Sequence, residues 1–146
     1  MPCLRVISVD SAFIDVLWDK VCRSGSYYSI GDGASKQTFH RVLFESAFVV
    51  EGDDFVIRAE MHPDCIELHP IVFGHSFFKN APVILAEAIL LIDRLFAKMP
   101  ICCIIPEGMR GAKRLAEIAG LVFERFVDRS LSGVVVRCSV FVKRRI

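Results

Sequence analysis

The sequence predicts an α/β (α+β) domain with a mixed, mostly antiparallel central sheet flanked by helices. Three apolar segments between residues 47 and 73 are separated by two tight turns, the pattern of an antiparallel meander. Residues 65–120 then read as strand, helix, buried strand and helix. A β-α-β unit needs a crossover helix that lies on the sheet. A meander joined to such a unit gives a mixed sheet with helices packed on it.

The N-terminal third is expected to supply one short strand and two helices. Residues 3–9 form a short apolar run, which predicts the opening strand. Residues 12–22 and 36–45 have apolar side chains at helical spacing, so each predicts a helix. The segment between them, residues 23–35, is rich in glycine and serine and predicts a loop.

The three strands of the meander are expected at residues 47–51, 55–62 and 65–73. In the second strand an apolar set of side chains alternates with a mixed set, as in an antiparallel strand with one face on the core. The mixed set includes Arg58, Glu60 and His62.

The most apolar part of the chain follows the meander. Pro82 suits the first position of a helix, where its missing N–H costs no hydrogen bond. We therefore expect a loop over residues 74–81 and a helix over 82–98. This helix has few polar residues, so it should be covered on most sides. Residues 101–105 contain no polar residue and predict a central strand that is buried on both faces.

The C-terminal part predicts a helix followed by a hairpin. Residues 109–119 place their apolar side chains on one stripe, and Gly120 suits the position that ends a helix. Residues 121–128 and 134–143 then predict two strands around a turn at 129–133.

Length, composition and charge restrict the class of protein. At 146 residues the chain should form a single domain, 1–146. Its net charge of +1 gives no general attraction to nucleic acid or to a membrane. Its hydrophobic fraction of 53% favours a dense core, or a core plus an apolar surface for a homodimer or a protein partner. Neither a signal peptide nor an apolar run of ~20 residues is visible, so we expect a cytoplasmic protein.

The six cysteines do not have the spacing of a metal site or of a disulfide framework. None of them forms a C-x-x-C pair, and most lie in apolar runs. Buried thiols in a reducing cytosol are the favoured interpretation, ahead of zinc ligands or disulfides. Cys102 and Cys103 should point to opposite faces if their segment is a strand.

Residues 66–123 resemble the acyl-CoA-dependent N-acyltransferases, the GNAT superfamily. Residues 66–73 resemble the central strand of that family, and Leu68-His69-Pro70 resembles variants associated with bacteriophage genomes. The order of the predicted elements is also that of the family, and it implies a sheet that splays between strands 65–73 and 101–105. The closing segment of the family is similar to Pro106-Glu107, Ala112, Leu115 and residues 119–123 of this chain.

The resemblance implies acetyl-CoA (coenzyme A) as the cofactor, held by the central strand and the loop that follows it. Backbone N–H groups and the dipole at a helix N-terminus favour an anion such as its pyrophosphate. Cations in the first turns of a helix oppose the dipole, so Arg110 and Lys113 are easier to understand if an anion binds there. A solvated basic face is the alternative. The residues expected to meet the cofactor are Phe73, His75, Phe78, Lys79, Asn80, Ala81, Arg110 and Lys113.

The chain departs from the family at three places. The loop before the helix lacks the usual glycines, Met109 replaces a frequent asparagine, and Ala116 replaces the tyrosine that often protonates the departing thiolate. Two interpretations follow. One is an acyltransferase that moves an acyl group from acyl-CoA to an amine-bearing acceptor and binds the cofactor in a modified way. The other is a catalytically inactive GNAT-like protein, phage-encoded, with a structural or assembly role, and the fold alone does not decide between them.

Acylation of an amine needs a base that removes a proton from the ammonium group. Glu67 and His69 alternate on one face of the central strand, and Glu60 lies on the preceding strand. The pair is the candidate catalytic base or relay. The alternative, simpler for each residue alone, is ordinary polar side chains on a partly solvated face. His62, His69 and Cys65 match no standard metal site, so no metal is expected.

Overall fold

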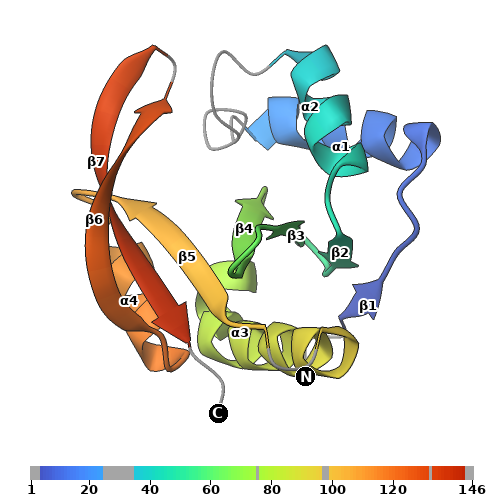
Figure 1. The fold of residues 1–146 in the computed structure, drawn as a ribbon. Helices are drawn as coiled ribbons and strands as arrows, with labels where there is room; N and C mark the ends of the chain where they lie inside the picture. The colour runs from blue at the N-terminus through green and yellow to red at the C-terminus, as the bar shows by residue number, and fades with distance from the viewer. Residues whose placement is uncertain (1–3, 25–34, 75, 97–98, 132, 144–146) are drawn as a thin grey trace.

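The computed structural model describes residues 4–24, 35–74, 76–96, 99–131 and 133–143. Most of the predicted loop 23–35, together with His75, lies outside these ranges. The described elements, in chain order, are β1 (Arg5–Val6), α1 (Ser11–Ser24), α2 (Lys36–Phe44), β2 (Phe48–Glu51), β3 (Phe55–Met61), β4 (Ile66–Val72), α3 (Ser76–Leu95), β5 (Ile101–Pro106), α4 (Arg110–Ile118), β6 (Val122–Leu131) and β7 (Val134–Lys143) (Figure 1).

The strands form one mixed sheet in the order β1-β2-β3-β4-β5-β7-β6. Every neighbouring pair is antiparallel except β4 and β5. The predicted fold class is therefore confirmed. The parallel ladder joins Ile66 to Ile101 and Glu67 to Cys102, after which β4 continues beside β3 and β5 beside β7. Beyond these two pairs β4 and β5 diverge, so the sheet is split near its centre (Figure 1).

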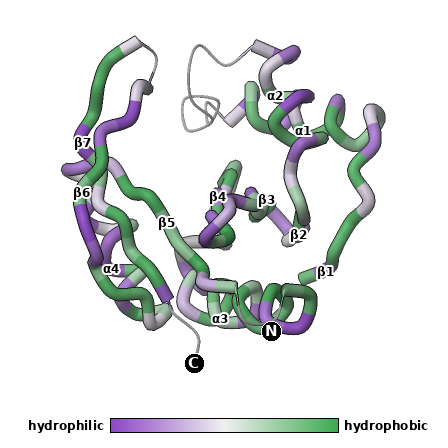
Figure 2. The backbone as a smooth tube through the Cα atoms, viewed as in Figure 1, coloured by the Kyte–Doolittle hydropathy of each residue, from purple (hydrophilic) through white to green (hydrophobic). Residues whose placement is uncertain are grey.

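Two hydrophobic cores lie on opposite faces of this sheet. The larger core packs α3 and α4 against one face, with Ile57, Ile84 and Ile101 among its buried residues. The smaller core packs α1 and α2 against β2–β4 on the other face, around Phe39 and Val56. Figure 2 shows that β5 is hydrophobic along most of its length, as the absence of polar residues in its sequence predicts.

On this second face, α1 and α2 cover only the half formed by β2–β4. No helix among the described residues covers the other half. On β5 and β7 this half carries a small apolar cluster made by Cys102, Val140 and Val142. The candidate site lies between this cluster and the two helices.

The predicted start of the long helix at Pro82 is wrong, because α3 begins at Ser76 and contains Pro82 in its interior. Proline removes one N–H from the helix and crowds the carbonyl four residues earlier, at a cost of ~3 kcal/mol. Pro82 itself is exposed. Its neighbours Ala81, Ile84 and Leu85 are buried, and this packing offsets the cost. The expected loop of residues 74–81 is accordingly shorter, and the first turn of the helix replaces most of it.

The C-terminal hairpin also differs from the prediction. The turn expected at residues 129–133 is too long, because β6 continues to Leu131 and Arg129 pairs with Val136. The predicted end of the preceding helix is confirmed, since Gly120 has φ +91°, which residues other than glycine rarely adopt. None of the helices in the described part of the chain has the length and apolarity that a membrane span requires.

Candidate active site

A cluster of six ionisable side chains forms where the cover of α1 and α2 ends. The antiparallel register of β3 and β4 places Val56 opposite Ile71 under the helices, and the next two pairs on the same face are polar. These pairs are Arg58 with His69 and Glu60 with Glu67. We call the following residues the charged cluster: Arg58, Glu60, His62, Glu67, His69 and Arg129.

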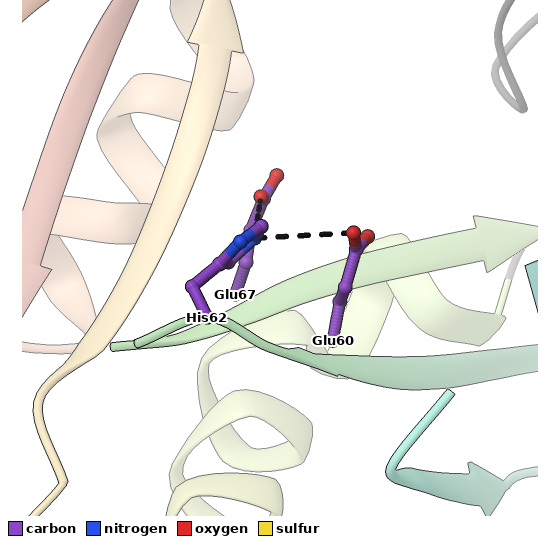
Figure 3. A group of neighbouring side chains, drawn as sticks. All are labelled: Glu60, His62 and Glu67. Carbon is purple, nitrogen blue, oxygen red and sulfur yellow. Dashed lines mark hydrogen bonds and ion pairs between the residues drawn. The ribbon is translucent and has the colours of Figure 1, made fainter. Parts of the chain in front are cut away.

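Glu67 is the centre of the charged cluster and is only 1% exposed. Arg129 of β6 donates to both of its oxygens, with distances of 3.0 Å to Oε1 and 3.1 Å to Oε2. The Nε2 atom of His62 hydrogen-bonds Oε1 at 2.8 Å (Figure 3). The Nε2 atom of His69 lies 2.9 Å from Oε2, in a direction unsuited to a hydrogen bond. Four polar contacts therefore hold one buried carboxylate in place.

The carboxylate of Glu60 lies close to both histidines. Its Oε2 atom accepts a hydrogen bond of 3.2 Å from Arg58 and lies 3.3 Å from Nε2 of His69. Its Oε1 atom lies 4.0 Å from Nε2 of His62 (Figure 3). The Nε2 atoms of both histidines therefore face the carboxylates of Glu60 and Glu67.

The electrostatics of the cluster fix the charge of Glu67. Burial by itself disfavours the ionised carboxylate, but His69 and Arg129 outweigh it and lower the pKa of Glu67 to about 2. A carboxylate with so low a pKa is a weak base and stays ionised at neutral pH. Its chemical role is then to hold and charge-stabilise an imidazole, which is the better proton acceptor.

Three members of the charged cluster, Arg58, His62 and Arg129, are absent from the residues that the sequence nominates for the chemistry. His62 ends the polar alternation Arg58–Glu60–His62, so the signal that would find it is the same one that marks Glu60. Arg129 is 62 residues from Glu67 in sequence and lies in a segment predicted as a turn. No local pattern indicates that β6 reaches β4.

A pocket of about 330 Å³ opens beside the charged cluster. Its wall includes His62 and Arg129 from the cluster and Cys65 and Cys102 from the ends of β4 and β5. Because His62 is 31% exposed while Glu67 is buried, the imidazole is the part of this pair that a molecule in the pocket can reach.

The residues nominated for the cofactor lie towards the other end of β4. Phe73 follows β4 six residues after Glu67, ~20 Å away along an extended strand. Its ring packs on the smaller core, 5.6 Å from Nζ of Lys20. The backbone at Phe78 lies in the first turn of α3, and Lys79 and Asn80 are exposed on that helix. Ala81 is fully buried in the larger core.

Arg110 and Lys113 lie in the first turns of α4, Arg110 exposed and Lys113 half-buried. Neither α3 nor α4 has an acidic residue in its first turn. Both helix N-termini therefore keep the positive potential that an anionic group prefers. The nominated residues of α3 follow the C-terminal end of β4 and those of α4 follow the C-terminal end of β5, whereas Glu67 and His69 lie within β4.

The donor atoms of Glu60, His62 and Glu67 lie within 4.8 Å of one another, a spacing that suits a divalent cation (Figure 3). Arg129, however, donates to both oxygens of Glu67, and Arg58 donates to Glu60. These guanidinium groups supply the positive charge that the two carboxylates need. We therefore interpret the charged cluster as an ion-pair network.

No protein-family model matches the sequence, and no curated protein is similar to it in sequence. In structure the chain is similar to an N-acetyltransferase from Staphylococcus aureus Mu50, with a TM-score of 0.75, 12% identity, and coverage of 99% of this chain and 97% of that one. It is also similar to an acetyltransferase of the GNAT family from Bacillus anthracis, with a TM-score of 0.74, 10% identity and coverage of 97% and 94%.

A third similar structure is the acetyltransferase from Bacillus subtilis in complex with CoA. Its TM-score is 0.69 at 12% identity, and both chains are covered completely. At these identities the likeness is one of fold, and it extends over the whole chain in each comparison. The fold that the resemblance implied is thus confirmed: this chain has the fold of the GNAT acetyltransferases.

Proposed function

We propose that this protein transfers an acetyl or other acyl group from acyl-coenzyme A to the amine of an acceptor. The observation that carries the proposal is the buried Glu67 carboxylate, which holds two imidazoles where β4 and β5 part. Solved structures with the same fold are acetyltransferases, and one of them is a complex with CoA.

The charged cluster supplies the base that the reaction needs. In neutral His62 the Nε2–H group donates to Glu67, so Nδ1 is the acceptor. An ammonium group in the pocket gives its proton to His62, and Glu67 stabilises the imidazolium that results. The neutral amine is then the nucleophile. In this proposal Glu67 of the nominated pair holds the charge, His62 carries the proton, and His69 contacts Glu67 at 2.9 Å from outside the pocket wall.

The thioester of acyl-CoA supplies the acyl group and a thiolate leaving group. Its phosphates fit the N-terminal ends of α3 and α4, where Lys79, Arg110 and Lys113 provide cations and neither first turn holds an acid. Because α3 begins at Ser76, the N–H groups available to an anion are those of its first four residues. Of the other residues nominated for the cofactor, Asn80 is exposed on α3, whereas Phe73 packs on the smaller core and Ala81 is buried in the larger one.

A second candidate is a GNAT-like protein without catalysis, phage-encoded, that serves in assembly as a homodimer or with a protein partner. The observation that favours it is the exposure of apolar side chains on the C-terminal hairpin, where Val122 at one end and Val134 and Val135 at the other are each more than 60% exposed. Ala116 also leaves no proton donor at the position where the family often has a tyrosine.

Calorimetric titration with acetyl-CoA and with coenzyme A separates the two candidates. We expect micromolar binding that weakens on R110A and K113A substitution, while R114A, a matched cation on the same helix, changes it little. H62N should leave this binding intact and lower the release of free thiol with amine acceptors. No heat and no thermal shift at millimolar ligand would contradict the acyltransferase and leave the assembly role.

A further inference from the structure

Two cysteines meet at the place where the central strands part. Cys65 immediately precedes β4, and Cys102 is the second residue of β5. Their Sγ atoms are 2.6 Å apart. Non-bonded carbon atoms rest ~3.5–4.0 Å apart, and sulfur is larger than carbon. Both are free thiols in this structure, and the contact brings the two sulfur atoms within about half an ångström of the S–S bond length of about 2.05 Å.

The backbone holds this pair in position. Glu67 is in register with Cys102, and the two cysteine side chains share the face that carries the charged cluster. The N–H of Ile66 donates to the carbonyl of Pro100 at 2.8 Å, and the N–H of His62 donates to the carbonyl of Cys65 at 2.9 Å. Both strand ends are thus fixed on either side of the sulfur atoms.

The other cysteines have no such arrangement. Cys103 follows Cys102 on β5 and therefore points to the opposite face, into the larger core. Cys138 bonds a backbone carbonyl through its own Sγ, and Cys22 is exposed on α1. Among the cysteines that the structure describes, Cys65 and Cys102 are the pair that meets.

We propose that Cys65 and Cys102 are a modification site, a thiol pair that forms a reversible disulfide and ties β4 to β5 at the closed end of the gap between them. The proposal departs from the interpretation favoured from sequence, which is buried thiols in a reducing cytosol.

A small disulfide such as oxidised glutathione is the class of oxidant that the site would accept. Both cysteines line the pocket of about 330 Å³, and Cys65 is the more exposed of the two. The Cys65 thiolate attacks the small disulfide, forms a mixed disulfide and releases one small thiol. Cys102 then loses its proton and its sulfur attacks that of Cys65, which releases the second small thiol. Two protein thiols are oxidised by two electrons, and one small disulfide is reduced to two thiols.

The reaction should be slow at neutral pH. Burial raises the pKa of Cys65, although the contact with Cys102 opposes this, and the thiolate is the attacking form. The test therefore measures an equilibrium and not a rate. The full chain is incubated to constant composition in mixtures of oxidised and reduced glutathione, its remaining thiols are alkylated, and its peptides are mapped without reduction.

We expect one linked peptide pair, Cys65 with Cys102, that appears as the mixture becomes more oxidising and disappears on reduction. C103S and C138S should keep the link. In C102S the Cys65 thiol should instead carry a glutathione adduct, because its partner is missing. Should C102S fail to fold, C65S at the partly exposed position provides the same comparison, with loss of the link.

The proposal is overturned if adducts are confined to the exposed Cys22 while Cys65 and Cys102 are both fully alkylated at every ratio. It is equally overturned if the link joins either of them to a different cysteine. Neither result depends on acyl transfer, so this test and the titration with acetyl-CoA fail independently.

Discussion

Replacement of Glu67 by glutamine should destabilise the fold by roughly 3 kcal/mol at neutral pH. The change keeps the shape of the side chain and removes the charge that Arg129, His62 and His69 contact. The pKa of Glu67 falls from its usual 4.5 to about 2 in the folded protein. At ~1.4 kcal/mol for each tenfold change in proton affinity, this fall corresponds to about 3 kcal/mol.

An independent estimate gives the same size. Removing one partner of a buried ion pair costs about 3–5 kcal/mol when the other charge stays buried. The Arg129 side chain is 38% exposed, so it can regain contact with water, and the loss should lie at the lower end. Domains of this size are stable by about 5–15 kcal/mol, so the variant should still fold.

The stability that E67Q loses must become smaller as the pH falls. Because the folded pKa lies below the unfolded one, the stability is fully present above pH 4.5 and is lost as the pH falls towards 2. At pH 3 the difference between wild type and E67Q should shrink to roughly 1.5 kcal/mol. Urea unfolding at pH 7 and pH 3, followed by the fluorescence of the single tryptophan, Trp18, measures both values.

The matched control is E60Q, since the Glu60 side chain is 41% exposed and its change should stay within about 1 kcal/mol. A loss below about 1 kcal/mol for E67Q at pH 7, or a loss of equal size at both pH values, would refute the electrostatic account of the cluster.

Four further predictions follow from the same structure. R129K keeps the charge but loses the two-pronged contact with Glu67, so urea unfolding should show a loss of about 1–2 kcal/mol, and an unchanged midpoint would contradict this. H62N should lower kcat/KM for amine acylation by roughly 10²–10⁴-fold and leave the affinity for coenzyme A unchanged. If H62N acylates amines at the wild-type rate, His62 is not the base. The Cys65–Cys102 disulfide would close a loop of 37 residues, worth up to about 4 kcal/mol, so calorimetry should find Tm raised by ~10 °C under oxidising conditions, an effect that C102S abolishes. P82A restores one helical N–H at an exposed position and should raise the unfolding free energy by at least about 1 kcal/mol, whereas a decrease would show that Pro82 is not a cost to α3.

The order of the elements was predictable because each one carries its own local signal. Alternation marks β3, the absence of polar residues marks β5, and Gly120 marks the end of α4. Pro82 misled the prediction for a physical reason. A proline excludes helix only through one N–H and one crowded carbonyl, and buried neighbours such as Ala81 and Ile84 can offset both.

The candidate site was predictable only where it lies within neighbouring strands. Alternation along β4 identifies Glu67 and His69, and the meander explains why Glu60 lies opposite Glu67. Arg129 comes from a hairpin at the far edge of the sheet, and its contact with Glu67 depends on how strongly that hairpin curves. Curvature of this kind results from the whole sheet, so no single segment encodes it.

The two-pair ladder between β4 and β5 has a consequence for motion. It leaves β1–β4 and β5–β7 as two plates that share few backbone hydrogen bonds, so the larger core and the Glu67–Arg129 contact must supply much of what joins them. Such plates can open against each other at a lower free energy than global unfolding. Amide hydrogens along the inner edges of β4 and β5 should therefore exchange sooner than those of the β6–β7 hairpin, whose nine paired positions protect each other. A ligand that contacts both plates would slow that exchange without touching a single amide itself.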